Sequence, residues 1–347
     1  MIGNSFKLIF LVLALLLIIV PLGCTKEVKP LTEEYNFTIC AASPPGDSYL
    51  LGVKQAEIVS RSLPDVTLNP MGIAGGAIGS ITRVEEGTID FGICTAEIVQ
   101  DLLTGTASFE GKPPGQNVRG YFSTGRIYYG QYVREDTGIK WVNELEGKAY
   151  APGRPGTQGT YITERTLEVL GIAIDSRPGG YADMAAAVQD KRVVGLEHST
   201  FPSHTEEGKI AVGAVVEELN YTVPMRHIGY TKEEASKLMA EIPGLLMKRI
   251  EPDGWKEGDP EMWVIDCVYL WGTHKDIPED VVYRIVKTLH ENYDEILAMQ
   301  SFRAGHLEGL VDAMNGYDIL LHPGTIKWLK ELGYEIPEKA IPPEMKQ

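Results

Sequence analysis

Four short segments rich in glycine and hydroxyl residues have the composition of ligand-binding turns. They read SPPGDSY at 43–49, GIAGGAIGS at 72–80, CTAE at 94–97 and PGRPGTQGT at 152–160. Each leads into a stretch with helical spacing, and the first turn of a helix exposes unpaired backbone N–H groups and a partial positive charge. These residue types therefore favour binding of a small anion such as a carboxylate.

The last of these segments is the main candidate anion site. A carboxylate there would accept hydrogen bonds from backbone N–H groups and from two hydroxyls, at about 1.5–3 kcal/mol for each charge-assisted bond. The alternative is a plain N-cap for the helix expected at 161–170. The candidate residues are Pro155, Gly156, Thr157, Gln158, Gly159 and Thr160.

Other candidates lie at the remaining turns. Ser48 and Tyr49 could contact a ligand, or Ser48 could simply cap a helix. Gly76 and Ala77 belong to the glycine-rich turn. Glu97 could hold a ligand ammonium group, and its alternative role is that of a first-turn acid favoured by the helix dipole.

Further candidates precede or end expected strands. Tyr128 and the neighbouring Tyr129 could stack on a ligand or hydrogen-bond to it. Arg126 could pair with a ligand carboxylate, or form a salt bridge between lobes. Glu197 ends a strand at a position that could face the site.

The tetrapeptide from Glu197 to Thr200 contains acid, imidazole and hydroxyl groups, but its spacing does not suit hydrolysis. Contiguous residues on a strand point to opposite faces, whereas a nucleophile, base and orienting group must converge. No G-x-S-x-G nucleophile turn occurs in the chain. The sequence therefore indicates a protein that is not an enzyme, with no catalytic residue and no cofactor.

Three cysteines sit in apolar strand-like runs, namely Cys40, Cys94 and Cys267. We expect them to be free and buried, where a thiol behaves as a small hydrophobic group. No CxxC pair or Cys/His ligand spacing is present, so no metal site is predicted.

The elements that would position these residues are short strands alternating with helices. Strands are expected at 37–42, 66–70, 89–94, 148–151, 193–197 and 262–271, and helices at 49–62, 96–103, 161–170, 182–189, 278–299, 302–314 and 325–332. This alternation predicts an α/β fold with βαβ units and mostly parallel sheets. Ligands bind at the carboxyl ends of strands in such sheets, where the four turns lie.

The N-terminus resembles an export signal. Leu8–Val20 is wholly apolar, follows Lys7, and is too short for a ~30 Å hydrocarbon core. The following Gly23-Cys24 resembles a bacterial lipobox, so we expect a signal peptide at 1–23, lipidation of Cys24 and a polar tether at 24–34. Plain secretion and an uncleaved anchor are the alternatives.

Composition excludes several classes of protein. The 347 residues carry 32 Lys+Arg against 48 Asp+Glu, a formal charge of -16. Because a phosphate backbone would on average be repelled, nucleic acid binding is not expected. The length suggests about two domains.

The chain resembles the TAXI family of TRAP-transporter solute-binding proteins from about Phe37 to Lys330. The matching phrases, in family order, are AASPPGDSYLLG at 41–52, GGAIGS at 75–80, EEGTIDFGICTAE at 85–97, REDTGIKWVNELEGKAYAPGRPGTQGT at 134–160, and His-Pro-Gly at 322–324, which we interpret as a helix-start turn. In the second phrase Ala77 replaces the usual Ser and Ser80 the usual Asn, which removes polar groups that would face the ligand.

The resemblance implies a two-lobe, type II periplasmic-binding-protein-like fold that closes on a small ligand, with crossover strands between the lobes. We place lobe 1 at 35–127 and 262–347, and lobe 2 at 128–261. The resemblance also implies TRAP permease membrane subunits as partners. The resulting hypothesis is an extracytoplasmic, lipid-anchored binding protein for a small carboxylate: an amino acid such as glutamate, or a 2-oxo or dicarboxylic acid. A membrane-anchored sensor or an extracytoplasmic enzyme on the same fold is the alternative.

Overall fold

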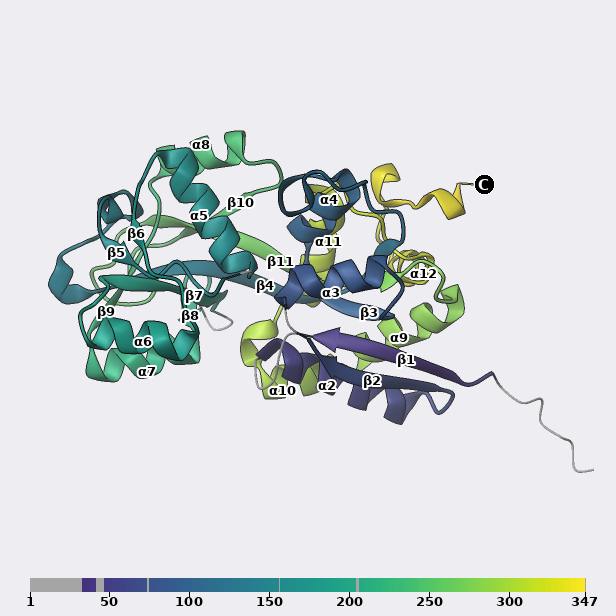
Figure 1. Ribbon diagram of the computed structural model, residues 1–347. Helices are drawn as coiled ribbons and strands as arrows, with labels where there is room; N and C mark the ends of the chain where they lie inside the picture. The colour runs from purple at the N-terminus through teal and green to yellow at the C-terminus, as the bar shows by residue number, and fades with distance from the viewer. Residues whose placement is uncertain (1–32, 42–46, 74, 156, 204–205, 347) are drawn as a thin grey trace, which may run out of the picture. The chain divides into compact units, whose positions relative to one another are not determined.

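The computed structural model describes residues 33–41, 47–73, 75–155, 157–203 and 206–346 (Figure 1). The expected signal peptide, the lipidation site Cys24 and nearly all of the tether lie outside these residues. Residues Tyr35–Gln347 form one compact unit. No helix in the described ranges has the length and apolar character that a membrane crossing needs.

Strands and helices alternate through most of this unit. The strands are β1 (Tyr35–Ala41), β2 (Val66–Gly72), β3 (Phe91–Thr95), β4 (Val118–Arg134), β5 (Ala149–Tyr150), β6 (Asp175–Ser176), β7 (Gly195–Pro202), β8 (Ile210–Val212), β9 (Met225–Ile228), β10 (Leu246–Ile250) and β11 (Met262–His274). The α-helices are α2 (Asp47–Ser62), α3 (Gly76–Glu85), α4 (Ala96–Thr104), α5 (Gln158–Leu170), α6 (Tyr181–Gln189), α7 (Ala214–Thr222), α8 (Lys232–Glu241), α9 (Glu279–Glu291), α10 (Tyr293–Met299), α11 (His306–Gly316) and α12 (Pro323–Glu331).

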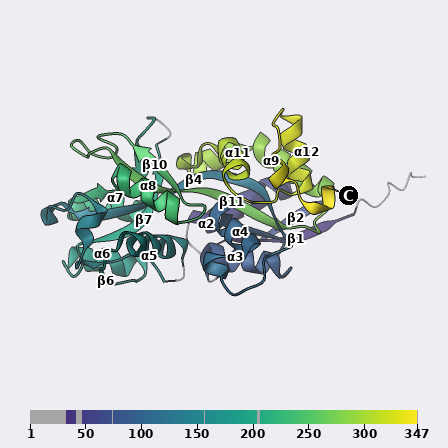
Figure 2. The same cartoon turned by 90° about the horizontal axis from the view of Figure 1, so that it is seen from above.

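Two long strands hold the sheet together. The described strand order is β2-β1-β3-β11-β4-β7-β8, with β10 beside β11 and β9 beside β4. The 17-residue β4 and the 13-residue β11 run antiparallel to each other (Figures 1 and 2). β3 pairs with the C-terminal part of β11, whereas β7 and β9 pair with the C-terminal part of β4. These two strands are therefore the crossover strands that the family resemblance implied.

The pairing directions correct one prediction. Parallel pairing occurs between β1 and β2, β1 and β3, and β5 and β6. Every pairing of β4 or β11 with another strand is antiparallel. The prediction of mostly parallel sheets is wrong here, because two long strands of opposite direction contribute so many of the pairings.

The expected lobe boundaries fall inside β4 and directly before β11. One boundary therefore lies on a crossover strand, and the other lies immediately before one. The division into lobe 1 at 35–127 and 262–347 and lobe 2 at 128–261 stays a prediction.

Helices cover both faces of the β4–β7–β9 part of the sheet. In Figure 1, α5 and α8 lie on one face of this part, and α6 and α7 lie on the other. At the opposite end, α2 packs on β1 and β2, and α3 packs on β3. The first turns of α2, α4 and α5 can thus place polar residues near the crossover strands.

Two helix boundaries differ from the sequence-based expectation. α3 begins at Gly76, so GAIGS forms its first turns and is not a loop before the helix. Gly75, at φ 93°, supplies the left-handed residue that starts it. The helix expected at 278–299 is two helices, α9 and α10, which meet at Asn292.

The core is dominated by aromatic and branched side chains on the crossover strands and the helices that cover them. Trp271 of β11 and Trp328 of α12 are among its largest fully buried members. Cys40, Cys94 and Cys267 are free and buried, which confirms the expectation for these thiols.

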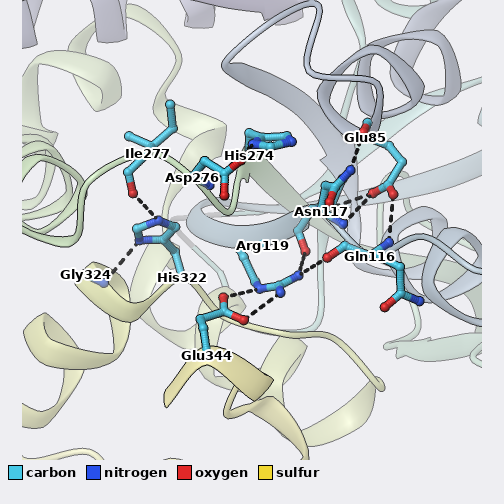
Figure 3. Close-up of polar contacts among 11 residues, drawn as sticks. Glu85, Gln116, Asn117, Arg119, His274, Asp276, Ile277, His322, Gly324 and Glu344 are labelled. Carbon is cyan, nitrogen blue, oxygen red and sulfur yellow. Dashed lines mark hydrogen bonds and ion pairs between the residues drawn. The ribbon is translucent and has the colours of Figure 1, made fainter. Parts of the chain in front are cut away.

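A polar network holds the C-terminal segment against the N-terminal end of β4 (Figure 3). His322 caps α12, since its Nδ1 accepts from the Gly324 N–H at 3.2 Å while Nε2 contacts the Ile277 carbonyl at 3.0 Å. The buried Arg119 donates to both carboxylate oxygens of Glu344, at 2.8 and 2.9 Å. The helix-start interpretation of His-Pro-Gly is confirmed.

Candidate functional site

The start of α5 lies directly against Glu197 of β7. A Cβ atom added to Gly159 would lie 2.8 Å from Glu197 Oε1, and one added to Gly153 would lie 2.7 Å from Oε2. Glu197 itself is fully buried. The two glycines therefore provide the space that the carboxyl group occupies.

The buried Glu197 carboxyl group lacks hydrogen-bond partners in the described part of the chain that would offset its loss of hydration. Neither of its oxygens has a hydrogen-bond partner among the described residues. Burial raises its pKa to about 8. Its cross-strand neighbour Gln131 is already satisfied, because it donates to Thr163 at 3.1 Å and accepts from the Tyr150 hydroxyl at 2.7 Å. The Glu197 carboxyl group is therefore costly to ionise unless a positively charged group lies beside it.

A second buried acid begins α4. Glu97 accepts a hydrogen bond from the Tyr317 hydroxyl at 3.0 Å. Burial raises the pKa of Glu97 and outweighs the hydrogen bonds it receives. One turn later, burial and the charge of Glu97 raise the pKa of Asp101 to about 7.

Tyr129 of β4 lies within electrostatic reach of both buried acids. Its phenol pKa is raised chiefly by burial, and Glu97 and Glu197 both add to the increase. Tyr128 instead packs among Ile210 and other residues of a separate apolar cluster. Of the two candidate tyrosines, Tyr129 is therefore the one within electrostatic reach of the buried acids, because adjacent strand residues point to opposite faces. A ligand contact of either tyrosine stays a prediction.

The start of α2 reaches the same part of the crossover strands. Ser48 Oγ hydrogen-bonds with the hydroxyl of Tyr269 on β11, and Tyr49 is half-buried. The guanidinium of Arg303 lies over the Tyr269 ring at 4.4 Å and over the Phe201 ring of β7 at 5.3 Å. Ser48 thus contacts a crossover strand, and its role in ligand binding stays a prediction.

The two hydroxyls at the start of α5 are used locally. Thr157 Oγ1 and Thr160 Oγ1 both donate to the Arg154 carbonyl, at 2.8 and 2.6 Å. Pro155 is exposed, and Gly156 lies outside the described residues. Any anion at this helix would therefore rely on backbone N–H groups rather than on the threonine hydroxyls.

Three further predicted residues have clear positions. Gln158 is buried, and its Oε1 has no hydrogen-bond partner in the described part of the chain. Gly76 is buried at the start of α3, and Ala77 packs against the main core.

Arg126 is committed to ion pairs. It donates to Asp266 of β11 at 2.9 Å through Nε, and it also pairs with Asp312 of α11. Arg126 and both partners lie in segments assigned to lobe 1, so these contacts are salt bridges but not the salt bridge between lobes that was considered.

The acid, imidazole and hydroxyl of 197–200 do not converge. Glu197 faces α5, whereas the His198 ring lies 4.5 Å from the Tyr181 ring of α6. In the described ranges, no three His, Cys, Asp or Glu residues gather as a metal site would require.

Two cavities elsewhere in the described part of the chain are lined largely by charged and polar residues. One, of about 520 Å³, is lined by residues that include Arg249, Met247 and Trp263, and Arg249 is paired with Glu251 and Glu261. The other, of about 310 Å³, is lined by residues that include Arg119 and Glu344. These two residues form an ion pair (Figure 3). Neither is lined by a predicted ligand residue.

With this geometry in place, comparison with known proteins assigns the family. The model of the NMT1-like family matches residues 39–333. The chain belongs to the NMT1-like family.

Several solved structures with low sequence identity are similar to this chain. An R. palustris protein solved with adipate has 13% identity and a TM-score of 0.50, covering 85% of this chain and 95% of that one. The periplasmic aliphatic sulphonate-binding protein of Escherichia coli has 12% identity and a TM-score of 0.44, covering 86% of this chain and 84% of that one. A putative L-cystine ABC transporter protein from Listeria monocytogenes has 11% identity and a TM-score of 0.46, covering 78% of this chain and 98% of that one. The predicted α/β fold of the type II periplasmic-binding-protein-like class is confirmed.

Proposed function

We propose that the protein is an extracytoplasmic solute-binding protein that captures a small carboxylate and delivers it to a membrane permease. The observation that carries this proposal is the gathering of helix starts and buried acids around β4, the strand that runs between the proposed lobes. Tyr129 lies within electrostatic reach of Glu97 at the start of α4 and of Glu197 beside the start of α5. Lobe closure around such a site would exclude water and strengthen each polar contact.

The ligand carboxylate would bind at the start of α5, where backbone N–H groups and the helix dipole favour an anion. Ser48, Tyr49, Gly76, Ala77, Gln158 and Glu197 are the proposed surrounding residues. Family membership and the likeness to the adipate-bound fold support a small organic ligand. The permease would be of the TRAP type, as the TAXI resemblance implies.

Native mass spectrometry of freshly purified protein tests for a captured solute. Thermal shift with a carboxylate panel then measures stabilisation, which should reach about 2.7 kcal/mol when the ligand is at 100 times its dissociation constant. Neutral sugars at equal concentration are the control. If sugars stabilise the protein and no carboxylate does, the proposed ligand class is wrong.

Membrane attachment would come from lipid on Cys24. The expected result of Cys24→Ala is a shift of the protein from the membrane fraction to the soluble extracytoplasmic fraction. A single acyl chain anchors weakly, so multiple chains would be needed for stable attachment. Unchanged membrane association of Cys24→Ala would show that lipidation does not hold it there.

A further inference from the structure

We propose that Glu197 binds a protonated amine of the solute, so that the ligand is an amine-bearing carboxylate. This inference rests on the proposed solute-binding function and narrows its ligand class. It selects amino acids over the 2-oxo and dicarboxylic acids that the turns alone would also accept.

The first argument is the position of the carboxyl group. It is fully buried, with both oxygens lacking hydrogen-bond partners among the described residues. Gly153 and Gly159 leave room for it, with their missing Cβ positions only 2.7 and 2.8 Å from its oxygens. A buried polar group with no partner in the ligand-free protein is readily explained if its partner arrives with the ligand.

The second argument is the neutrality of its surroundings. The titratable groups whose pKa values are raised by Glu197 are phenols, namely Tyr129 and Tyr132 of β4, Tyr150 of β5 and Tyr181 of α6. The start of α5 presents Gly159 and Thr160, which do not titrate. Among the described residues, no Lys, Arg or His charge contributes to the pKa of Glu197, and burial is the sole cause of its increase. The cation that would balance an ionised Glu197 must therefore come from outside the described residues.

An ammonium beside Glu197 would exchange for the proton that the acid carries in the empty site. The carboxyl group gives up its proton to solvent and becomes the anionic partner of the ammonium group, so charge is conserved in the pocket. Ligand binding should therefore release protons at pH 7, and the release should be smaller at pH 8.5, because a larger share of a group with a raised pKa is already ionised there.

Isothermal titration calorimetry measures this release directly. Binding is titrated in phosphate and in Tris buffers, whose different ionisation enthalpies reveal the number of protons released. The probes are matched pairs that differ only in the amine: L-glutamate with glutarate, L-alanine with propanoate, and 4-aminobutanoate with butanoate. We expect an amine-bearing member to bind at least tenfold more tightly than its partner, with proton release.

The variant Glu197→Gln should lose the proton release and bind the amine at least tenfold more weakly. Asp101→Asn removes another buried acid of raised pKa and should keep the release. If Glu197→Gln does not fold, the wild-type proton count still decides the question.

Each outcome has a distinct meaning. Binding of the amine-free members, or amine binding with no proton release, would overturn the role of Glu197 while the solute-binding function stands. Failure of every probe and every carboxylate to bind would overturn both.

Discussion

At the scale of single residues, the defining feature is a carboxyl group that the empty protein cannot ionise cheaply. Ionising a buried acid without a partner costs several kcal/mol, so the acid keeps its proton instead. Glu197 does so with a pKa of about 8, and Asp101 with a pKa of about 7. These groups link stability to pH in the ligand-free state.

The sign of this linkage follows from the raised pKa. Because the folded-state pKa of Glu197 lies above its ordinary value of 4.5, its contribution to stability is present below about pH 4.5 and is lost as pH rises toward 8. We expect Glu197→Gln to gain stability relative to wild type between pH 5 and pH 8 without ligand. Melting temperatures at both pH values measure this, and an equal difference at the two values would contradict it.

The fit between Gly159 and Glu197 predicts a coupled substitution. Gly159→Ala should destabilise the protein, since the new Cβ would meet Oε1 at 2.8 Å. Gly316→Ala at the end of α11 is the control, because nothing lies within 4 Å of its Cβ, and it should leave the stability nearly unchanged. In urea unfolding, adding Glu197→Ala to Gly159→Ala should reduce the loss below the sum of the two single changes. Strict additivity would show that the two residues do not press on each other.

At the scale of elements, the position of a helix was predictable where turn residues precede it. α2, α4, α5 and α12 each begin within three residues of the expected position. The long β4 was not predicted, because its three glycines interrupt the apolar pattern. Gly130 is required there, since a Cβ would lie 2.2 Å from Thr200 Oγ1 on β7.

The missed strand explains why the choice between the two candidate tyrosines stayed open. Without β4, sequence reasoning could not tell which of Tyr128 and Tyr129 faces the acids. Arg303 was also missed, because its place over Tyr269 and Phe201 depends on chain segments far apart in sequence. Glu97 was predictable from its place directly after β3, but its burial was not. Glu197 was expected to end a strand, whereas it lies near the beginning of β7, because β7 starts and ends later than the apolar run at 193–197 suggests.

The cap of α12 gives a prediction at this scale. His322→Ala removes the acceptor for the Gly324 N–H and the contact with the Ile277 carbonyl, and should cost about 0.5–2 kcal/mol. His322→Asn retains a capping oxygen and should recover part of the loss. Chemical unfolding measures both, and equal stability of His322→Ala and wild type would refute a capping role.

At the scale of the whole molecule, aromatic residues join the two proposed lobes. Phe201 of β7 stacks on Phe302 with ring centroids 4.0 Å apart, and Arg303 lies over both rings. Phe201 belongs to the proposed lobe 2, and the other two residues belong to the proposed lobe 1. This contact is therefore suited to favour the closed, ligand-holding arrangement.

Phe302→Ala should weaken that closure. An aromatic pair contributes about 0.5–1.5 kcal/mol, so solute affinity should fall about two- to tenfold with little change in secondary structure. Tyr221→Ala, at a site that is 83% exposed, is the control and should bind as wild type does. Calorimetry with the solute identified by mass spectrometry measures the affinity of each variant. Unchanged affinity of Phe302→Ala would show that this contact does not stabilise the closed arrangement.

A crystal structure with the captured solute tests the central claim most directly. We predict solute density between the start of α5, the carboxyl group of Glu197 and the ring of Tyr129, with a nitrogen of the solute beside Glu197. Density in the cavity lined by Met247 and Trp263, with none at Glu197, would contradict the account.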